Sequence, residues 1–293
     1  MSAINKLLIA VKVEAHVFHN GQYCGLWAVD TSGTQHMTFH MVSYGICHLT
    51  IGEETILLNA GDAIFFPTDA SHRASNSKSK GVAVNQAVSF PMTEETKNDS
   101  TGLVCGHFVH QHPLFDKLLM QLPDYIVIRG GAGSSASAVI DLMLAESRQA
   151  DQSTNMLLNR LSDCLLYILL RDHVDTESGL FSAMAHPSLG ESLTLIHSNP
   201  TYKLTLDKLA SAAAMSRSAY ASLFKQMVGL SPADYIFQWR MAQAHRWLAD
   251  DGISTLDAAL RCGYESEASF SKAFKRVLGV GPGVARNMYS RIQ

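Results

Sequence analysis

The sequence predicts an α+β protein with a β-rich N-terminal half and an all-α C-terminal domain. In residues 15–110, short apolar runs are separated by Gly, Asn and Asp, which is typical of the many short strands of a sandwich or barrel. The last ninety residues show helical spacing of apolar side chains, and they contain one pattern twice. A length of 293 residues also favours two domains.

Short strands are expected throughout the first half. Turn-forming residues bound most runs, and Pro67 ends the run that follows the turn at Gly61 and Asp62. The predicted strands cover residues 25–29, 36–44, 47–51, 55–58, 63–66, 82–88 and 103–109. The predicted domain boundaries are 1–130 for this domain, 131–180 for a helical linker and 186–293 for the C-terminal domain.

Two helices are expected between the domains, within residues 135–174. The second helix has an apolar stripe that forms either a dimer interface or a contact with the β domain. A segment rich in Ser, Gly, Ala and Pro follows at 175–187 and predicts a linker. The positions of the stripe are Leu158, Leu161, Leu165, Ile168 and Leu169.

The C-terminal pattern returns at an offset of fifty residues, and it aligns without a gap. Each copy predicts a short helix, a tight turn, a second helix and a Gly-x-x-Pro stop, which is the outline of a helix-turn-helix. Gly263 lies in the turn of copy two, whereas its counterpart Ala213 leaves copy one to close its turn without glycine. The recurring pairs include Leu206 and Leu256, Ser216 and Ser266, Phe224 and Phe274, Gly229 and Gly279, and Pro232 and Pro282.

The second helix of each copy has an apolar face and a polar face, and the polar face is the candidate for DNA contact. A helix fits the major groove, where Arg or Lys reads guanine and small side chains contact other base edges. Lys225 and Lys275 lie near the helix ends and are better placed for phosphates. An ordinary solvated surface is the alternative. The candidates are Arg217, Ser218, Ala221, Ser222 and Lys225 in copy one, and Glu267, Ala268, Ser269, Ser271, Lys272 and Lys275 in copy two.

These residues make the C-terminal domain resemble the AraC/XylS DNA-binding domain, over about 186–287. The resemblance rests on Thr205-Leu-Asp-x-Leu-Ala210, Met215-Ser-Arg-Ser218, Trp239-Arg-Met241, Gly263-Tyr-x-Ser266 and Phe270-x-x-Ala-Phe-Lys275. It implies a long helix over 232–248 between two reading units, and a dimeric transcription factor, an activator, with double-stranded DNA and RNA polymerase as partners. Gly281 replaces the Ser and Ala285 the Tyr that are usual in the family, so a looser last helix is expected.

Charge and composition agree with this interpretation. Residues 200–293 carry a net charge of +5, and the total is −3, so residues 1–199 carry −8. A positive charge at one end of the chain favours phosphate binding there. No apolar run is long enough to span a membrane, and no secretory signal is recognised. Five cysteines at irregular spacing favour a reducing cytoplasm, and Cys47, Cys164 and Cys262 fall in apolar runs that suggest structural roles.

The run Gly61-x5-Pro67-x-Asp69-x2-His72-x3-Asn76 resembles the second cupin motif, with Asp69 in place of the usual Gly. It implies a cupin-like β-barrel, or jelly roll. The first cupin motif is poor, because His36 and His40 are four residues apart. Further segments resemble the cupin subgroup of AraC-type regulators that senses reactive chlorine. The alternative is a metal-dependent cupin oxygenase or isomerase with an accessory helical domain, which leaves the repeat unexplained.

Three kinds of signal are open for the first domain. His40, His72, Cys105 and His107 could bind a metal, with zinc as the candidate, because imidazole and thiolate suit such ions. Oxidation of Cys24 and Cys105 is the second possibility. A small organic ligand is the third, in a barrel lined by Trp27, Phe39, Phe65 and Phe66. In each case the alternative is an ordinary packed core.

Overall fold

The computed structural model describes residues 13–34, 36–78, 88–92, 100–110, 112–149, 154–173, 179–201 and 204–289. Its contacts divide the chain into two compact units. Residues 13–109 and 122–174 form the sheet unit, and residues 110–121 and 175–293 belong to the helical unit. This division supports the predicted α+β class. Among the described residues, no helix is both long and apolar enough to cross a membrane.

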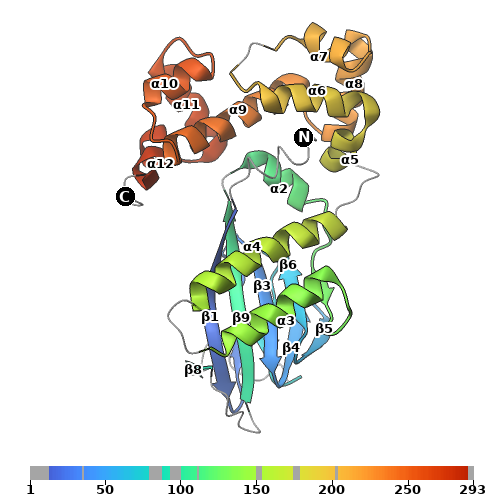
Figure 1. The fold of residues 1–293 in the computed structure, drawn as a ribbon, viewed down its shortest axis with the longest axis vertical. Helices are drawn as coiled ribbons and strands as arrows, with labels where there is room; N and C mark the ends of the chain where they lie inside the picture. Colours follow the sequence, from blue (N-terminus) through green and yellow to red (C-terminus); the bar gives the residue numbers. More distant parts are fainter. Residues whose placement is uncertain are drawn as a thin grey trace. The chain divides into compact units, whose positions relative to one another are not determined.

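The sheet unit contains two antiparallel sheets, as expected for a barrel or sandwich. One sheet has the order β10-β6-β3-β9-β1-β8, and the other has the order β2-β7-β4-β5 (Figure 1). The strands are β1 (Val13–Cys24), β2 (Ala28–Val29), β3 (Met37–Tyr44), β4 (Ile46–Ile51), β5 (Glu54–Asn59), β6 (Ala63–Phe66), β7 (Arg73–Ser75), β8 (Ser89–Pro91), β9 (Ser100–His110) and β10 (Ile126–Ile128). The predicted strand at 82–88 falls almost entirely outside the described residues.

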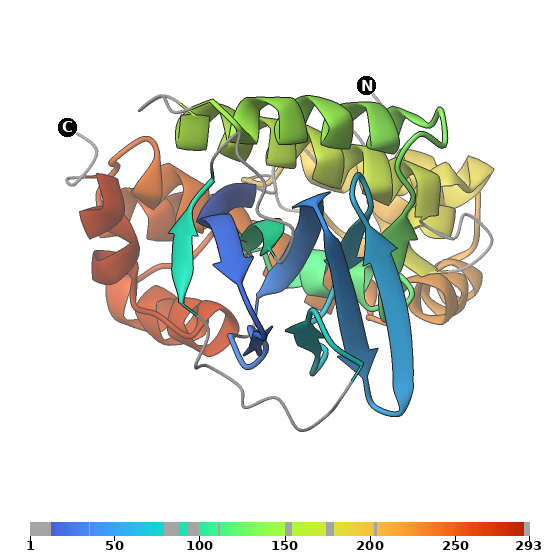
Figure 2. The same ribbon diagram turned by 90° about the horizontal axis from the view of Figure 1, so that it is seen from below.

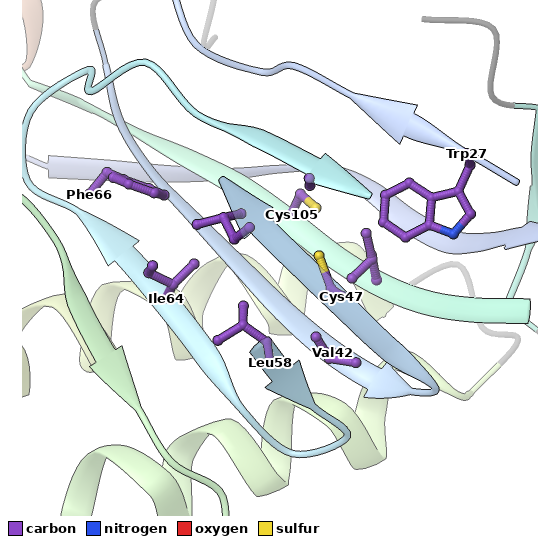
Figure 3. Packing of buried hydrophobic residues seen from close by; sticks show 10 residues of the cluster. Trp27, Val42, Cys47, Leu58, Ile64, Phe66 and Cys105 are labelled. Carbon is purple, nitrogen blue, oxygen red and sulfur yellow. The ribbon is translucent and has the colours of Figure 1, made fainter. Parts of the chain in front are cut away.

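The core of the sheet unit lies between its two sheets. Val42 and Cys105 from one sheet meet Cys47 and Leu58 from the other, and Trp27 closes one end of the cluster (Figure 3). Side chains alternate along each strand, so only every second residue reaches this core. The predicted barrel lining was therefore wrong for two of its four aromatics. Phe39 and Phe65 are paired neighbours that pack on Phe108, and neither belongs to this cluster.

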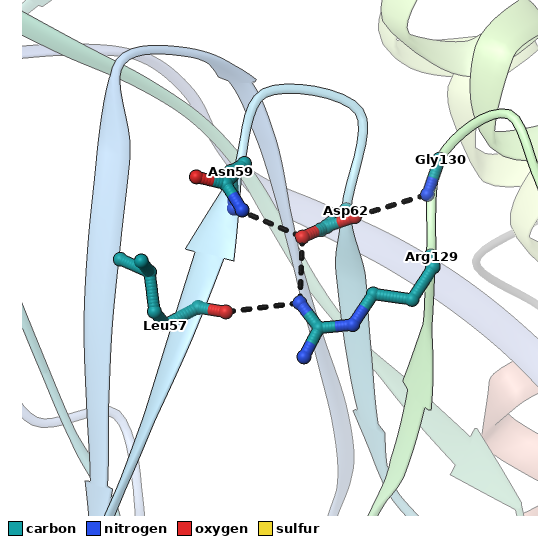
Figure 4. A network of polar contacts seen from close by, with 5 residues as sticks. All are labelled: Leu57, Asn59, Asp62, Arg129 and Gly130. Carbon is teal, nitrogen blue, oxygen red and sulfur yellow. Dashed lines mark hydrogen bonds and ion pairs between the residues drawn. The ribbon is translucent and has the colours of Figure 1, made fainter.

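A buried carboxylate fastens β10 to the β5–β6 turn. Asp62 accepts hydrogen bonds from the backbone N–H groups of Asn59 (2.9 Å) and Gly130 (3.0 Å). Its Oδ2 also accepts from Arg129 Nη1 at 2.7 Å, and this guanidinium binds the Leu57 carbonyl (Figure 4). Burial alone would raise the pKa of Asp62, but these hydrogen bonds and the Arg129 charge lower it below its usual value.

The two helices expected between the domains belong to the sheet unit. These are α3 (Ser135–Ser147) and α4 (Thr154–His173), and they cover the outer face of the larger sheet (Figures 1 and 2). Two side chains of α4 accept hydrogen bonds from backbone N–H groups of β1, Asn159 from Val17 and Asp163 from Ala15. Leu158, Leu165 and Leu169 are buried. The interpretation as packing against the β domain therefore holds for these three leucines.

The helical unit differs from the predicted boundaries in two ways, because it includes residues 110–121 and begins again at residue 175 instead of 186. The linker predicted at 175–187 was therefore wrong, since most of it forms the helix α5. The short helix α2 (Pro113–Leu119) lies between β9 and β10 in sequence, yet it contacts α5 and α9. The burial of apolar side chains explains why α2 belongs to the helical unit, because Leu114, Phe115 and Leu118 are fully buried. The other helices of the unit are α5 (Gly179–Ala185), α6 (Pro187–Ser198), α7 (Leu206–Ala212), α8 (Arg217–Val228), α9 (Pro232–Ala249), α10 (Thr255–Arg261), α11 (Glu267–Leu278) and α12 (Pro282–Tyr289).

Each sequence copy forms a helix-turn-helix, but the alignment without a gap was wrong in the first helix. Thr205 and Ser254 are the N-caps of α7 and α10, which gives an offset of 49, whereas Ser216 and Ser266 cap α8 and α11 at an offset of 50. Copy two therefore has one extra residue before its second helix. The short turn-forming stretch conceals this insertion, because Leu-Asp recurs by chance at the wrong offset.

The structural counterpart of Gly263 is Ala214, and not Ala213. Gly263 has φ +83° and Ala214 has φ +52°, and each amide donates to the carbonyl three residues earlier, in Leu260 and Ser211. Copy one thus closes its turn without glycine, as predicted. It does so by placing an alanine in the left-handed region, where a Cβ is disfavoured.

Candidate nucleic-acid interface and sensing site

The helices α8 and α11 are built alike from their caps inward. The hydroxyl groups of Ser216 and Ser266 accept from the N–H groups of Ala219 and Ser269, which satisfies donors that the helix leaves free. At the other end, Gly229 (φ +75°) and Gly279 (φ +74°) provide the left-handed residue that ends each helix. These local signals fix where both candidate reading helices begin and end.

The apolar faces of α8 and α11 anchor them to the core of the unit. Tyr220 and Phe224 are fully buried in copy one, and Phe270 and Phe274 occupy the same places in copy two. Val228 is also buried, whereas Met227 and Val277 are half-buried. The buried stripe predicted from the helical spacing is confirmed, with this shift at its C-terminal end.

The predicted DNA-contacting residues lie on the opposite, solvent-facing sides of these helices. Ala221 and Ser271 are half-buried, and the other nine residues are exposed. The two faces differ in charge, because α8 carries Arg217 and Lys225 without an acid, whereas α11 offsets Lys272 and Lys275 with Glu267. An exposed helix face with excess positive charge and small side chains suits a major groove.

The helix α9 connects the two reading units over the predicted length. It packs against α8 on one side and against α10, α11 and α12 on the other. Trp239 and Trp247 are buried on it, and Tyr235 is fully buried against Phe224. Ala285, expected to loosen the last helix, is itself fully buried in the core around Phe270 and Phe274. The helix α9 therefore contributes buried side chains to both copies, Tyr235 beside Phe224 in copy one and Trp247 in the core of copy two.

Two buried histidines form a polar site inside the sheet unit. His40 Nε2 lies 2.8 Å from His72 Nε2, and Thr31 Oγ1 lies 3.2 Å and 2.9 Å from these two atoms. The pKa of His40 is lowered to about 3, first by burial and then by His72, so the pair is neutral near pH 7. Thr31 was not predicted, because a lone Thr in a loop carries no sequence signal.

The other predicted metal ligands are less closely assembled. Cys105 pairs in register with His40 and shares its face of the sheet, but it packs in the apolar cluster. His107 instead contacts His36 and His16, with ring centroids 5.1 Å and 5.5 Å apart. In the part of the chain that the structure describes, no three His, Cys, Asp or Glu residues are grouped to hold a metal ion.

The burial of one cysteine differs from what the sequence predicts. Cys47, Cys105 and Cys262 are buried, but Cys164 is exposed on α4, so its predicted structural role was wrong. The apolar run around Cys164 is amphipathic, and Cys164 lies on its outer side. Burial raises the pKa of Cys105 well above its usual value, which opposes thiolate formation. Cys24 is half-buried.

Comparisons with known proteins agree with the geometry of both units. Residues 3–175 match the family profile described as "Cupin", and residues 209–288 match that of a helix-turn-helix domain. An AraC-like transcription regulator of Streptomyces antibioticus is 29% identical, over 97% of both chains. An HTH-type transcriptional regulator of Haemophilus influenzae is 27% identical over 99% of this chain and all of its own. The RCS-specific activator RclR of Escherichia coli is 27% identical, over 85% of this chain and 83% of its own.

Proposed function

Because the chain belongs to the cupin family through residues 3–175 and is an AraC-type transcription regulator, we propose that α8 and α11 read a DNA sequence together. The two faces differ in composition, so the reading is asymmetric. Arg217 and Lys272 contact bases, Lys225 and Lys275 contact phosphates, and the small side chains allow close approach. The observation that carries this proposal is the exposure of nearly all eleven candidates on two matched, capped helices.

The test starts from DNA fragments that the full-length protein selects from the genome. Affinity is then measured by fluorescence anisotropy over a range of salt concentrations, against a scrambled fragment of equal length and composition. We expect strong preference for the selected fragment and a steep loss of affinity with salt, because cations released from phosphates drive part of the binding. Equal affinity for the scrambled fragment would refute sequence-specific reading.

The active form is proposed to be a cytoplasmic homodimer that activates transcription through RNA polymerase. Part of α4 supports the dimer, because Met156, Leu157 and Tyr167 are exposed on its outer side at 67%, 41% and 39%. Three of the five residues of the predicted stripe, Leu158, Leu165 and Leu169, are buried within the sheet unit. We therefore place the dimer surface on the exposed residues beside them. Sedimentation at micromolar concentration tests this assembly directly.

The signal is proposed to act at the pair His40 and His72, where polar atoms interrupt an apolar interior. Zinc is the candidate metal, with the two imidazoles as its ligands, because Cys105 shares the face of His40 but packs in the apolar cluster. Metal analysis of the purified protein tests this assignment, and an unchanged metal content in His40→Ala or His72→Ala would refute it. Oxidation at Cys24 and Cys105 is the second candidate signal, for which half-buried Cys24 is the more accessible thiol. Promoter binding with and without oxidant tests it.

An enzymatic role is not proposed for the cupin domain. The relatives that cover nearly the whole chain are transcription regulators. A metal-dependent oxygenase or isomerase would need further ligands, and it would leave the matched pair of reading helices without a purpose.

A further inference from the structure

The helix α2 belongs to the helical unit, although the strands β9 and β10 on either side of it lie almost entirely in the sheet unit. Two residues separate the end of β9 from the start of α2, and six separate the end of α2 from the start of β10. The strand β9 holds Cys105 in register with His40, and β10 is fastened through Asp62 and Arg129. A change in either strand therefore reaches α2 through a short length of chain.

Side-chain contacts also tie the end of β9 to α2. His110 is the last residue of the strand, and its Nε2 lies 3.3 Å from Asp116 Oδ1. The rings of His110 and Phe115 meet edge to face, with centroids 4.9 Å apart. Leu114, Phe115 and Leu118 are fully buried, so the removal of apolar surface from water holds α2 in the helical unit. The strand end and α2 thus form one local cluster.

A series of ring contacts leads from α2 to the first candidate reading helix. His112, the residue before α2, has its ring centroid 5.4 Å from that of Trp239 on α9. Trp239 also stacks on His197 with centroids 4.0 Å apart, and Nε2 of His197 lies 2.7 Å from the Tyr235 hydroxyl. Tyr235 in turn contacts Phe224 of α8. Because α9 also packs against α11, α2 contacts the helix that both reading helices share.

The contact of α2 with α9 includes a group that opposes it. His112 is 4% exposed, and neither of its ring nitrogens has a hydrogen-bond partner among the described residues. A neutral imidazole has one donor and one acceptor, and leaving both unpaired in the interior is unfavourable. The apolar side chains of α2 favour the docked position, whereas hydration of His112 favours release. Such opposed contributions suit an element that alternates between two positions.

We propose that α2 couples the two units by alternating between a position docked on α9 and a released position. Binding of DNA to α8 and α11 orders α9 and favours the docked position, which restrains the end of β9. Coupling between two sites is reciprocal, so a signal that moves β9 changes DNA affinity by the same factor. This coupling rests on the proposed reading of DNA by α8 and α11.

Hydrogen exchange of the full-length protein tests the coupling, with the selected DNA fragment compared with the scrambled one. In the parent, the selected fragment should slow amide exchange at least about fivefold in both 103–109 and 113–119. The test variant carries Gly-Ser-Gly insertions after Val109, at the boundary of the sheet unit, and after exposed Pro123. In this variant DNA should still protect 113–119, but no longer 103–109. A six-residue insertion after Gly52, in the exposed turn between β4 and β5, is the control and should keep both effects.

A second variant tests the docking of α2 without DNA. His112→Leu removes the unpaired ring nitrogens, and the start of α2 loses no cap, because the His112 side chain makes no capping hydrogen bond. Exchange in 113–119 should become about fivefold slower than in the parent, since the docked position no longer buries an unpaired polar group. Unchanged or faster exchange would overturn the two-position mechanism.

The coupling itself is overturned if DNA does not protect 103–109 in the parent, or if this protection persists after the insertions that flank α2. Equal affinity of the parent for the selected and scrambled fragments would instead refute the proposed DNA reading. The effect of His112→Leu on 113–119 is measured without DNA, so it still distinguishes a docked α2 from a released one in that case.

Discussion

Arg217, the first residue of α8, is held by Asp207 of α7 through an ion pair of 3.2 Å between Nε and Oδ1. Both side chains are about two-thirds exposed, so the pair contributes little to stability. The ion pair instead orients Arg217, because it links this candidate base-reading side chain to the preceding helix. Copy two has Leu256 and Glu267 at the matching positions and cannot form this pair.

Replacing Arg217 with alanine should weaken binding to the selected DNA by about 1–3 kcal/mol and relax preference at one base position. Lys272→Ala should act similarly in copy two. Lys225→Ala should instead weaken binding to all sequences and lower the salt dependence, because it removes a phosphate contact. Anisotropy titrations with a set of single-base variants of the site separate the two behaviours. Full affinity in the double variant Arg217→Ala, Lys272→Ala would contradict these assignments.

The turns of the two copies give a matched pair of backbone tests. Gly263→Ala introduces a Cβ at φ +83° and should destabilise the helical unit by about 1 kcal/mol or more. Ala214→Gly removes a Cβ at φ +52°, and this relief should offset the added freedom of the unfolded chain. Urea unfolding of both variants measures how much more Gly263→Ala destabilises the helical unit than Ala214→Gly does. Equal destabilisation by the two changes would show that the turns are not equivalent.

The buried histidines predict a loss of stability in acid. His40 and His112 each have a pKa lowered to about 3, first by burial, so both are neutral in the folded protein near pH 6. Below pH 6.5 the unfolded chain binds more protons than the folded one, so stability falls as the pH decreases towards 3. Each histidine contributes a slope of about 1.4 kcal/mol per pH unit in that window.

His40→Gln removes one of these groups and should flatten the acid slope of the sheet unit. Urea unfolding at pH 7.0 and 5.5 gives the change in stability for the parent and the variant. The comparison of slopes matters, since the substitution itself alters stability at both pH values. A parallel dependence on pH would mean that His40 is already protonated, or that it is solvated, in the folded protein.

The outer side of α4 should control dimerisation. Met156→Glu places a charge at an exposed apolar position and should shift the protein towards monomer in sedimentation experiments. Leu142→Glu on α3 is the control, because Leu142 is also an exposed apolar residue but lies on the other helix. Equal effects of the two changes would remove α4 as the specific interface.

The sequence predicted those features that short-range signals encode. Caps at Ser216 and Ser266, glycine stops and apolar spacing located α8 and α11, and the cupin-like run located His72 at a strand end. The sequence could not reveal the offset of 49 in the first helices, because one inserted residue in a turn leaves no compositional trace. It also missed the partner Thr31, since the contact of Thr31 with His40 and His72 depends on tertiary packing.

The second limit of the sequence predictions was that they did not show which side of a strand or helix is buried. Period-two alternation could have separated Phe39 and Phe65 from Phe66 and His40, but only once the bounds and faces of the strands were known. The exposure of Cys164 has the same cause, because the apolar run of α4 covers more of its circumference than the sheet unit buries. Neighbours in sequence therefore had opposite environments.

Reactivity of the thiols follows from these environments and discriminates among the possible signals. Cys164 is exposed and should be alkylated first by iodoacetamide at pH 7.5, and half-buried Cys24 should follow. Cys47 and Cys105 should react only in denaturant, because both are buried and burial raises the pKa of each thiol, for Cys47 to about 12. Mass spectrometry after timed labelling gives the order.

Rapid native labelling of Cys105 would show that the sheet unit opens around it, and direct oxidation would then become the stronger explanation of sensing. Slow labelling that a metal chelator does not accelerate would remove Cys105 as a thiolate ligand and leave the pair His40 and His72 as the polar centre of the domain.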